Sequence, residues 1–421
     1  MTSEDRRLAR KERRISQRKA KSEKFIAEHS DFEQVCSLDN LHAAYIKSRK
    51  GVSWKESVQH YDADLMFNLL ETRYKLLAGK PVTKGFVEFD IHERGKIRHI
   101  RSVHISERVV QKSLCDNALV PLLSRSLIYD NGASVKNKGI HFAMNRCRAH
   151  LHRFYCENKT NEGYALVIDF SKYFDNIRHD ILLKMESKKI TDPRTFSLYK
   201  DFVKVFGDEL SLGLGSQVSQ ISAISLPNPI DHYIKEVLHV KYYARYMDDS
   251  YLFDTSKEYL EYCLSEITKL CDELGIKINT KKTKIVRLDE GFWFLKGKYI
   301  LTSTGKIVCR ASRDGCIRMR RKLKKFKVKY DNGEMSMNDI YESYQSFRSH
   351  LSSFDSYHLI KNMDQFFKAL FHENKGGGEN GCYYRKCILS DKRRCSRTSY
   401  GLGRNEDHGR YNKAGYGNYT A

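Results

Sequence analysis

Two adjacent carboxylates, Asp248 and Asp249, lie between two apolar stretches in the segment YYARYMDDSYLF. An ordinary hairpin turn would explain the pair, because an aspartate side chain can hydrogen-bond to the backbone just beyond it. Two carboxylates at one tight turn can also form one wall of a divalent-metal site, since such ions bind hard oxygen ligands. A metal site needs further oxygen ligands from elsewhere in the chain, so a third carboxylate would favour that interpretation.

A third carboxylate, Asp169, ends the nearly continuous apolar segment GYALVID, which is typical of a buried strand. If this strand neighbours the strands around Asp248 in one antiparallel sheet, the three acids converge. Close carboxylates repel one another unless cations share the site. Two Mg²⁺ ions bridged by three carboxylates are the arrangement for phosphoryl transfer: one lowers the pKa of an attacking 3′-hydroxyl and the other stabilises the pyrophosphate that leaves.

The overall composition predicts a polyanionic partner. The chain has 421 residues, with 75 Lys and Arg against 52 Asp and Glu, and its formal net charge is +23. Nucleic acid and an acidic membrane surface are the two candidates. No apolar run approaches the roughly 20 residues of a membrane span, and the charged start MTSEDRRLARKERR is unlike a signal peptide. We therefore expect a cytoplasmic protein, without membrane segments, in which the eleven cysteines are reduced.

Periodicity predicts an alternation of strands and helices around these acids. The expected elements are a hairpin within 85–103, a helix from 106, a buried strand at 163–169, helices at 179–205 and 219–239, a hairpin at 241–254, a helix at 257–274 and strands at 276–278 and 292–301. The segment RMRRKLKKFKVK then follows, basic at most positions. We expect the Gly-, Tyr- and Arg-rich end of the chain to be loosely ordered in isolation.

With Asp169 in the segment VIDFSKYFDNI and the turn YMDD, the chain resembles the palm of a reverse transcriptase. Other motifs match in order: GKIRHI and SERVVQKSL resemble the fingers motifs, SLGLGSQVSQ the template and nucleotide loop, and LGIKINTKKTKI and GFWFLKGKYI the later palm motifs, the second being the primer grip. The resemblance covers about residues 85 to 300. Its overall look is closest to the compact prokaryotic enzymes outside mobile introns, among which are phage-defence enzymes.

The resemblance implies an α+β right-hand polymerase fold, with a palm built from an antiparallel sheet that has helices on one face. We expect a basic N-terminal arm at 1–50, fingers at 51–160, the palm at 161–300, a mainly helical basic thumb at 301–372 and a flexible tail at 373–421. The implied activity is RNA-directed DNA synthesis with two Mg²⁺ ions per site, for which Mn²⁺ is a possible substitute.

The resemblance assigns roles around the three acids. Asp169 and Asp248 are expected to bind both metals, with Asp249 assisting and the carbonyl of Phe170 as a further ligand. Phe174 matches the aromatic steric gate, whose ring would clash with a ribose 2′-hydroxyl and so select deoxynucleotides. Taken alone, Phe174 is better explained as a core aromatic.

Three basic residues match positions that contact the nucleotide. Lys96 and Arg98 lie near the expected fingers tip, where they would clamp the triphosphate, although an exposed charged hairpin explains them as well. Lys282 is a candidate proton donor to the leaving pyrophosphate, and its neighbours Lys281 and Lys284 are alternatives for that role.

The chain departs from the family in the nucleotide loop. Many members have Leu-Pro-Gln-Gly where this chain has Gly213-Leu214-Gly215, so Leu214 occupies the position of the Gln that normally touches the incoming nucleotide. We hypothesise altered fidelity or base preference. Gln217 could partly substitute, or could hydrogen-bond within the loop.

Basic segments predict the nucleic-acid surface. In the expected thumb the candidates are Arg318, Arg320, Arg321, Lys322, Lys324 and Lys325. A solvated helix face is the alternative for them, whereas a flexible tail without a nucleic-acid contact is the alternative for the basic arm. The partners that follow are dNTPs, a DNA product and an RNA template, most simply a dedicated structured non-coding RNA. The tail residues Cys382, Cys387, Cys395 and His408 lack common zinc spacings and are expected to be free.

Two other functions stay open at this stage. One is template-independent DNA synthesis, including synthesis primed on a tyrosine of the protein. The other, from a different class, is RNA binding without catalysis on a polymerase scaffold. The chain is also compatible with a homo-oligomer.

Overall fold

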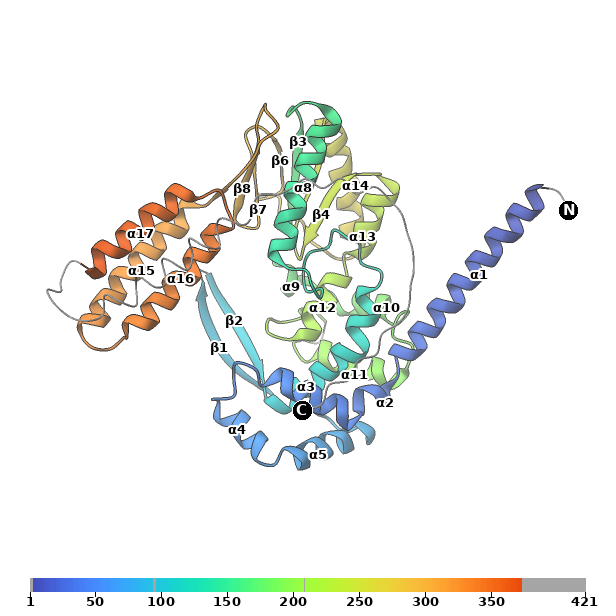
Figure 1. Cartoon of the computed structure of the whole chain (residues 1–421). Helices are drawn as coiled ribbons and strands as arrows, with labels where there is room; N and C mark the ends of the chain where they lie inside the picture. The colour runs from blue at the N-terminus through green and yellow to red at the C-terminus, as the bar shows by residue number, and fades with distance from the viewer. Residues whose placement is uncertain (1–2, 94–95, 208, 373–421) are drawn as a thin grey trace, which may run out of the picture.

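The computed structural model describes residues 3–93, 96–207 and 209–372 (Figure 1). The chain begins with a long helix that projects from the body and continues into four short helices below the sheets (Figure 1). These helices are α1 (Ser3–His29), α2 (Phe32–Cys36), α3 (Leu38–Ser48), α4 (Glu56–Ala63) and α5 (Leu65–Leu77). The predicted tail at 373–421, with its cysteines and His408, lies outside the described residues.

A two-stranded ribbon follows, formed by β1 (Phe86–Glu93) and β2 (Lys96–Val103). The strands pair antiparallel from Phe86 opposite Val103 to Glu93 opposite Lys96, which confirms the predicted hairpin. In Figure 1 the ribbon rises from the short helices towards α16. Successive side chains of each strand point to opposite faces of the ribbon, so only every second residue can face the rest of the molecule.

Helices build the two cores that flank the central sheet. They are α6 (Ile105–Leu114), the π-helical turn η1 (Cys115–Leu119), α7 (Val120–Ser124), α8 (Ile140–Asn158), α9 (Tyr173–Asn176), α10 (His179–Glu186), α11 (Pro193–Lys204), α12 (Gln217–Ser225), α13 (Asn228–His232), the π-helical turn η2 (Tyr233–Val237) and α14 (Lys257–Glu273). The two long helices predicted at 179–205 and 219–239 are thus divided. Pro193, at the start of α11, suits a helix start because its missing N–H is not needed there. Of these helices, α8 belongs to the second core, and the others that contribute buried residues belong to the main core.

The central sheet has four antiparallel strands in the order β4-β5-β3-β6. They are β3 (Tyr164–Asp169), β4 (Tyr242–Tyr246), β5 (Asp249–Asp254) and β6 (Lys284–Arg287). Alternate residues of β3 enter different cores: Leu166 packs with α14, whereas Ala165 packs with α8. In addition to the predicted helical layer, the second face is therefore covered by α8 and a small second sheet.

The small sheet joins the central sheet to the last helices. It contains β7 (Phe292–Phe294), β8 (Gly297–Leu301) and β9 (Ile307–Ala311), in that order. The helices α15 (Arg313–Asp331), α16 (Met337–Ser352) and α17 (Tyr357–His372) form a bundle with its own apolar core. Asp355 ties this bundle to β9, since its carboxylate accepts from the Cys309 amide at 2.7 Å and its amide donates to the Cys309 carbonyl at 2.8 Å.

None of the described helices has the length and apolar character that a membrane crossing would need. The described cysteines are all unpaired thiols.

Candidate active site

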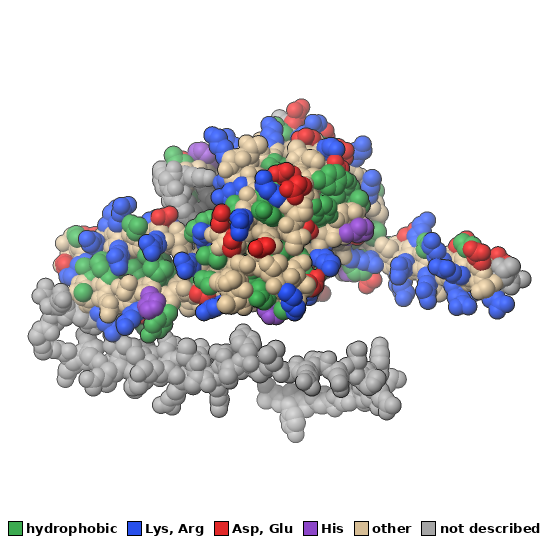
Figure 2. All heavy atoms as spheres, turned by 90° about the horizontal axis from the view of Figure 1, so that it is seen from above, with side chains coloured by type: hydrophobic (Ala, Val, Ile, Leu, Met, Phe, Trp, Pro, Cys, Tyr) green, Lys and Arg blue, Asp and Glu red, His purple; other side chains and the backbone are tan. Residues whose placement is uncertain are grey.

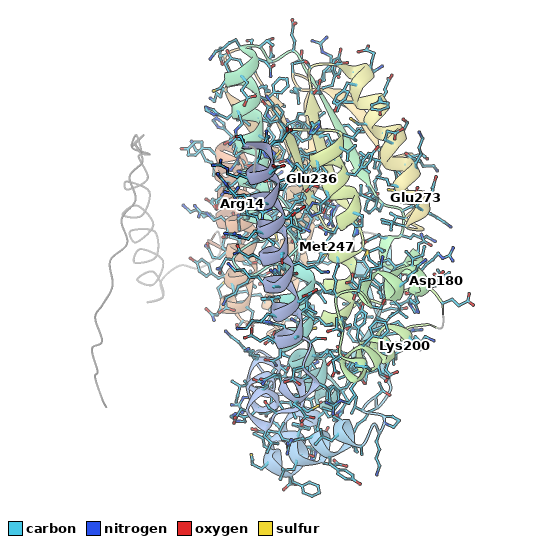
Figure 3. The ribbon with its side chains drawn as sticks, turned by 90° about the vertical axis from the view of Figure 1, so that its right-hand side faces the viewer. Arg14, Asp180, Lys200, Glu236, Met247 and Glu273 are labelled. Carbon is cyan, nitrogen blue, oxygen red and sulfur yellow. The ribbon has the colours of Figure 1, made fainter. Side chains whose placement is uncertain are left out.

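The turn between β4 and β5 presents the first carboxylate. Tyr246 pairs with Asp249 across the hairpin, so Met247 and Asp248 form the two-residue turn. Met247, labelled in Figure 3, has a φ of 55°, which residues with a Cβ adopt rarely. Asp249 is the first residue of β5 rather than part of the turn. The two adjacent acids therefore stand on different structural elements.

The other acid comes from the neighbouring strand. β3 pairs antiparallel with β5, and Asp169 is the direct partner of Asp249. Directly opposite residues of an antiparallel pair project from the same face of the sheet. The strand neighbourhood required by the three-carboxylate hypothesis is therefore present.

The Asp169 carboxylate is held by two side chains from the segment after α14. Asn279 donates from Nδ2 to Oδ1 at 2.9 Å, and Lys282 donates from Nζ to Oδ2 at 2.6 Å. The Asn279 amide also donates to the Asp169 carbonyl at 2.8 Å. Asp169 raises the pKa of Lys282, so the ammonium stays charged beside the carboxylate. Asn279 was not among the predicted site residues, although it lies in the segment LGIKINTKKTKI, because a sequence motif does not show which distant residue its side chain contacts.

The electrostatics of the three acids suit a cation site. Burial, then the charge of Asp248, then that of Asp169 raise the pKa of Asp249 to about 7. A bound cation stabilises the ionised form of a carboxylate that burial and neighbouring carboxylates disfavour. Within residues 3–93, 96–207 and 209–372, no three His, Cys, Asp or Glu side chains are already clustered as metal ligands. Instead, the ammonium of Lys282 is the cation bonded to Asp169.

A cleft of about 610 Å³ opens above Asp169 and Asp248. Phe174 and Leu214 line it, together with Phe170, Asn279 and Lys282, so most of the predicted nucleotide-contacting residues meet at one cavity. Gln217 is different: it is the first residue of α12, is half-buried and is not among the residues that line the cleft. The cleft geometry therefore gives no support to the suggested substitution of Gln217 for the missing loop glutamine.

The loop that carries Leu214 is fastened to the segment that carries Phe174. The Leu212 amide donates to the Phe174 carbonyl at 3.0 Å. Gly213 has a φ of +61°, and a Cβ there would lie 2.1 Å from the ring of Phe206. Only glycine fits this close approach, so the loop conformation depends on residue 213.

The ribbon contributes basic residues that were not predicted from the sequence. Ile97, His99 and Arg101 of β2 line the cleft, which is the period-2 set that strand alternation allows. Arg101 donates to the Phe206 carbonyl at 3.0 Å, and His99 lies 2.5 Å from the Asp90 carboxylate. The side chains of the predicted Lys96 and Arg98 lie outside the described part of the chain. Counting alternate positions along β2 would have identified His99 and Arg101 as candidates.

A second groove, of about 620 Å³, separates the small sheet from the helical bundle. Trp293 of β7, which is 44% exposed, and Lys296 line it on one side. Arg318 and Lys322 of α15 line it on the other, four residues apart on one helix face. An exposed aromatic ring among three cations is suited to a nucleic-acid strand.

The remaining predicted cations of α15 are all exposed but do not share one face. At 100° per residue, Arg321 and Lys325 fall on the same side of the helix as Arg318, whereas Arg320 and Lys324 fall on the opposite side. Arg320 accordingly lies over the Phe366 ring of α17, 5.3 Å from its centre. The groove side of α15 is thus more basic than the side that faces α17.

Residues 88–329 match the family model described as reverse transcriptase (RNA-dependent DNA polymerase). No curated protein matches the sequence. Among solved structures, a telomerase from Candida albicans in complex with a fragment of telomeric RNA is similar, with 11% identity, a TM-score of 0.44, and coverage of 72% of this chain and 57% of the telomerase chain.

Two structures of apo telomerase from Candida tropicalis are also similar. The one truncated from its C-terminal domain has 12% identity and a TM-score of 0.42, with 58% of this chain and 60% of that chain covered. The other has 13% identity and a TM-score of 0.42, with 80% and 72% covered. The chain thus spans less than two thirds of the first two telomerase chains.

Proposed function

Because the chain belongs to the reverse transcriptase family of RNA-dependent DNA polymerases, we propose that it is a catalytically active member that adds dNTPs to a 3′-hydroxyl on an RNA template. Its fold is the α+β right-hand polymerase fold. The observation that carries the proposal is the pairing of Asp169 with Asp249 beside the Asp248 turn, at a cleft large enough for a nucleotide. We assign residues 51–160 to the fingers, 161–300 to the palm and 301–372 to the thumb.

Asp169, Asp248 and Asp249 would hold two Mg²⁺ ions, or Mn²⁺ in their place, with the Phe170 carbonyl as a further ligand. When bound, these ions supply positive charge to the attacking and leaving oxygens of phosphoryl transfer. The raised pKa of Asp249, caused first by burial and then by the charges of Asp248 and Asp169, supports this donor set.

The chain's own side chains would orient the nucleotide and move its proton. Lys282, already charged beside Asp169, donates a proton to the leaving pyrophosphate. Phe174 excludes a ribose 2′-hydroxyl from the cleft. Arg101 places further positive charge towards the triphosphate, in addition to the clamp that we predict at Lys96 and Arg98, and the His99 ring lines the same cleft.

The template and its duplex with the product would follow the basic groove beside Trp293, Arg318 and Lys322. We propose a structured non-coding RNA as the natural template and a cytoplasmic role in phage defence. Sequencing the nucleic acids that co-purify with the full chain tests the first part. Phage challenge of cells that carry either the unmodified chain or Asp248→Ala tests the second.

The decisive experiment is extension of a primed RNA template by the purified chain with labelled dNTPs and Mg²⁺. We expect product from the unmodified chain, none from Asp248→Ala, and unchanged product from Asp180→Asn, an exposed acid paired with Arg178 on the surface. Product that forms without a template would favour template-independent synthesis. Tight RNA binding without product under any condition would favour the non-catalytic scaffold and overturn the proposal.

A further inference from the structure

The helix α1 stands apart from the body of the protein, as Figures 1 and 2 show. Its 27 residues correspond to about 40 Å of helix. Residues 3–21 are exposed at every position, and contact with the core begins at Phe25 and Ile26 in the last turns. The guanidinium of Arg125 anchors this end, 4.3 Å from the centre of the Phe25 ring. The projecting part is therefore a surface without packing of its own.

The charges on α1 are sorted by side. The helix contains ten Lys and Arg against five Asp and Glu. At 100° per residue, nine of the ten cations fall within one sector of about 160°. These nine, here called the basic stripe, are Arg6, Arg7, Arg10, Lys11, Arg13, Arg14, Arg18, Lys21 and Lys24. Of the basic residues only Lys19 lies outside the stripe, and of the acids only Glu28, in the last turn, lies inside it.

The cations of the basic stripe repel one another unless a partner of opposite charge binds them. Like charges four residues apart, such as Arg10 and Arg14, destabilise a helix that has no packing to compensate for their repulsion. Arg14 is labelled in Figure 3, and the spacing of 100° per residue places it near the centre of the stripe. A polyanion along the stripe would neutralise these charges and stabilise the helix, so charge complementarity identifies the class of partner.

The absence of aromatic side chains narrows that class. Residues 3–21 contain no Phe, Tyr or Trp, so the projecting part has no ring on which an unpaired base could stack. Its exposed apolar residues, Leu8 and Ile15, lie away from the centre of the stripe and are too few for insertion into a lipid surface. Contacts from Arg and Lys alone are suited to the phosphates of a base-paired helix.

We propose that the basic stripe of α1 binds the phosphate backbone of double-stranded RNA outside the catalytic cleft. The proposal rests on the polymerase function proposed above, because it makes this duplex a stem of the RNA that carries the template. Polymerisation in the cleft and binding of the stem are then separate activities of one chain. A short primed template without a stem should need only the first.

The chain offers a matched pair of substitutions for the test. Lys21 and Lys19 are both exposed and only two residues apart, yet they lie about 160° apart around the helix. Glutamine removes the charge with little change in helix propensity. The stripe is weakened further in the triple variant Arg10→Gln/Arg14→Gln/Lys21→Gln, which removes three cations from its centre.

Binding of the full chain to a 20-base-pair RNA duplex is measured by fluorescence anisotropy over 50–300 mM salt. At 0.1 M salt we expect up to about an eightfold loss of affinity for each phosphate contact removed, because each contact contributes about 0.9 to the logarithmic salt slope. Lys21→Gln should therefore weaken binding, Lys19→Gln should not, and the triple variant should lower the slope by about 3.

Extension of a short primed RNA without a stem separates this proposal from the polymerase proposal. Unchanged extension by the triple variant together with weakened duplex binding supports both. If the unmodified chain extends no primer but the triple variant still loses duplex binding, the polymerase proposal fails, whereas the stripe proposal stands as an RNA-binding property. Any of three results would overturn the stripe proposal. The triple variant could bind the duplex with the affinity and salt slope of the unmodified chain, or Lys19→Gln and Lys21→Gln could lose equal affinity. The third result is that the stripe binds anionic phosphatidylserine vesicles but not the duplex.

Discussion

Arg245 donates from Nη2 to Oδ2 of Asp231 over 2.6 Å, and the two side chains are 1% and 0% exposed. Arg245 also donates from Nη1 to the Met247 carbonyl at 3.1 Å and from Nη2 to the Ile224 carbonyl at 2.9 Å. The ion pair thus connects the helices under the sheet to the turn that presents Asp248. A buried cation with a partner on each side can hold the unusual backbone of Met247 in place.

The Asp231→Asn substitution should destabilise the protein strongly, because it leaves the Arg245 guanidinium buried without a counter-charge. Breaking a buried pair in this way costs about 3–5 kcal/mol. The midpoint of urea unfolding should fall accordingly. Arg178→Met, which removes an ion pair at the surface, is the control and should leave the midpoint unchanged. Equal midpoints for the two variants would show that the buried pair contributes no more than a surface pair.

Lys282→Ala should lower kcat by about 100-fold, the usual contribution of a general acid, with a smaller change in KM. The exposed neighbour Lys281 is the matched control, and Lys281→Ala should retain activity. Single-turnover primer extension measures both. Arginine keeps the positive charge but cannot give up its proton. If the Lys282→Arg variant has the full kcat of the unmodified chain, Lys282 therefore acts by its charge alone and not as a proton donor.

Phe174→Ala should raise the ratio of ribonucleotide to deoxynucleotide incorporation about 10-fold or more, because removal of the ring opens space for a 2′-hydroxyl. The half-buried Phe196 of α11 is not among the cleft-lining residues, so Phe196→Ala should leave the ratio unchanged. Competition between labelled ATP and dATP on one template gives the ratio directly. If Phe174→Ala leaves the ratio of ribonucleotide to deoxynucleotide incorporation unchanged, Phe174 is a core aromatic and not a steric gate.

Leu214→Gln should change the error rate, since residue 214 lines the cleft and, by the resemblance to the family, takes the place of a Gln that we propose would contact the nucleotide. We expect fewer misincorporations in the variant, measured by sequencing products from a defined template. Leu210→Gln, at an exposed position of the same loop region that does not line the cleft, should behave like the unmodified chain. If the unmodified chain has an ordinary error rate and Leu214→Gln does not change it, the hypothesis that Leu214 alters fidelity is wrong.

Stability should depend on pH through His150. Burial lowers the pKa of this histidine to about 4, although Asp130 acts in the opposite direction. In the unfolded chain this histidine has a pKa near 6.5 and takes up a proton more readily than in the folded protein. The free energy of unfolding therefore has its full value above pH 6.5 and decreases by up to about 3 kcal/mol as the pH falls towards 4.

The corresponding variant is His150→Gln, which cannot be protonated. The difference in unfolding free energy between the unmodified chain and this variant should shrink between pH 7 and pH 5. The window lies above the range in which most carboxylates titrate. A difference that stays constant across the window would mean that His150 has an ordinary pKa.

Much of the catalytic centre could be predicted because its signals are local. The apolar run before Asp169 predicts a buried strand, and the apolar stretches around Asp248 and Asp249 predict a hairpin. Both elements formed, and they are neighbours in one sheet. The family motifs then assigned Phe174, and the cleft includes it. These features depend on periodicity and on short spacings, which one sequence contains in full.

Contacts between distant segments were decided only by the tertiary structure. The position of Asn279 and Lys282 on Asp169 depends on how the segment after α14 crosses the sheet. The pairing of Arg245 with Asp231 depends on the packing of α13 under β4, and a polar residue in an apolar strand does not reveal its partner. On β2, the direction of the ribbon decided that His99 lines the cleft. Sequence patterns specify which face of an element is apolar, whereas the partner of a buried charge is specified by three-dimensional packing.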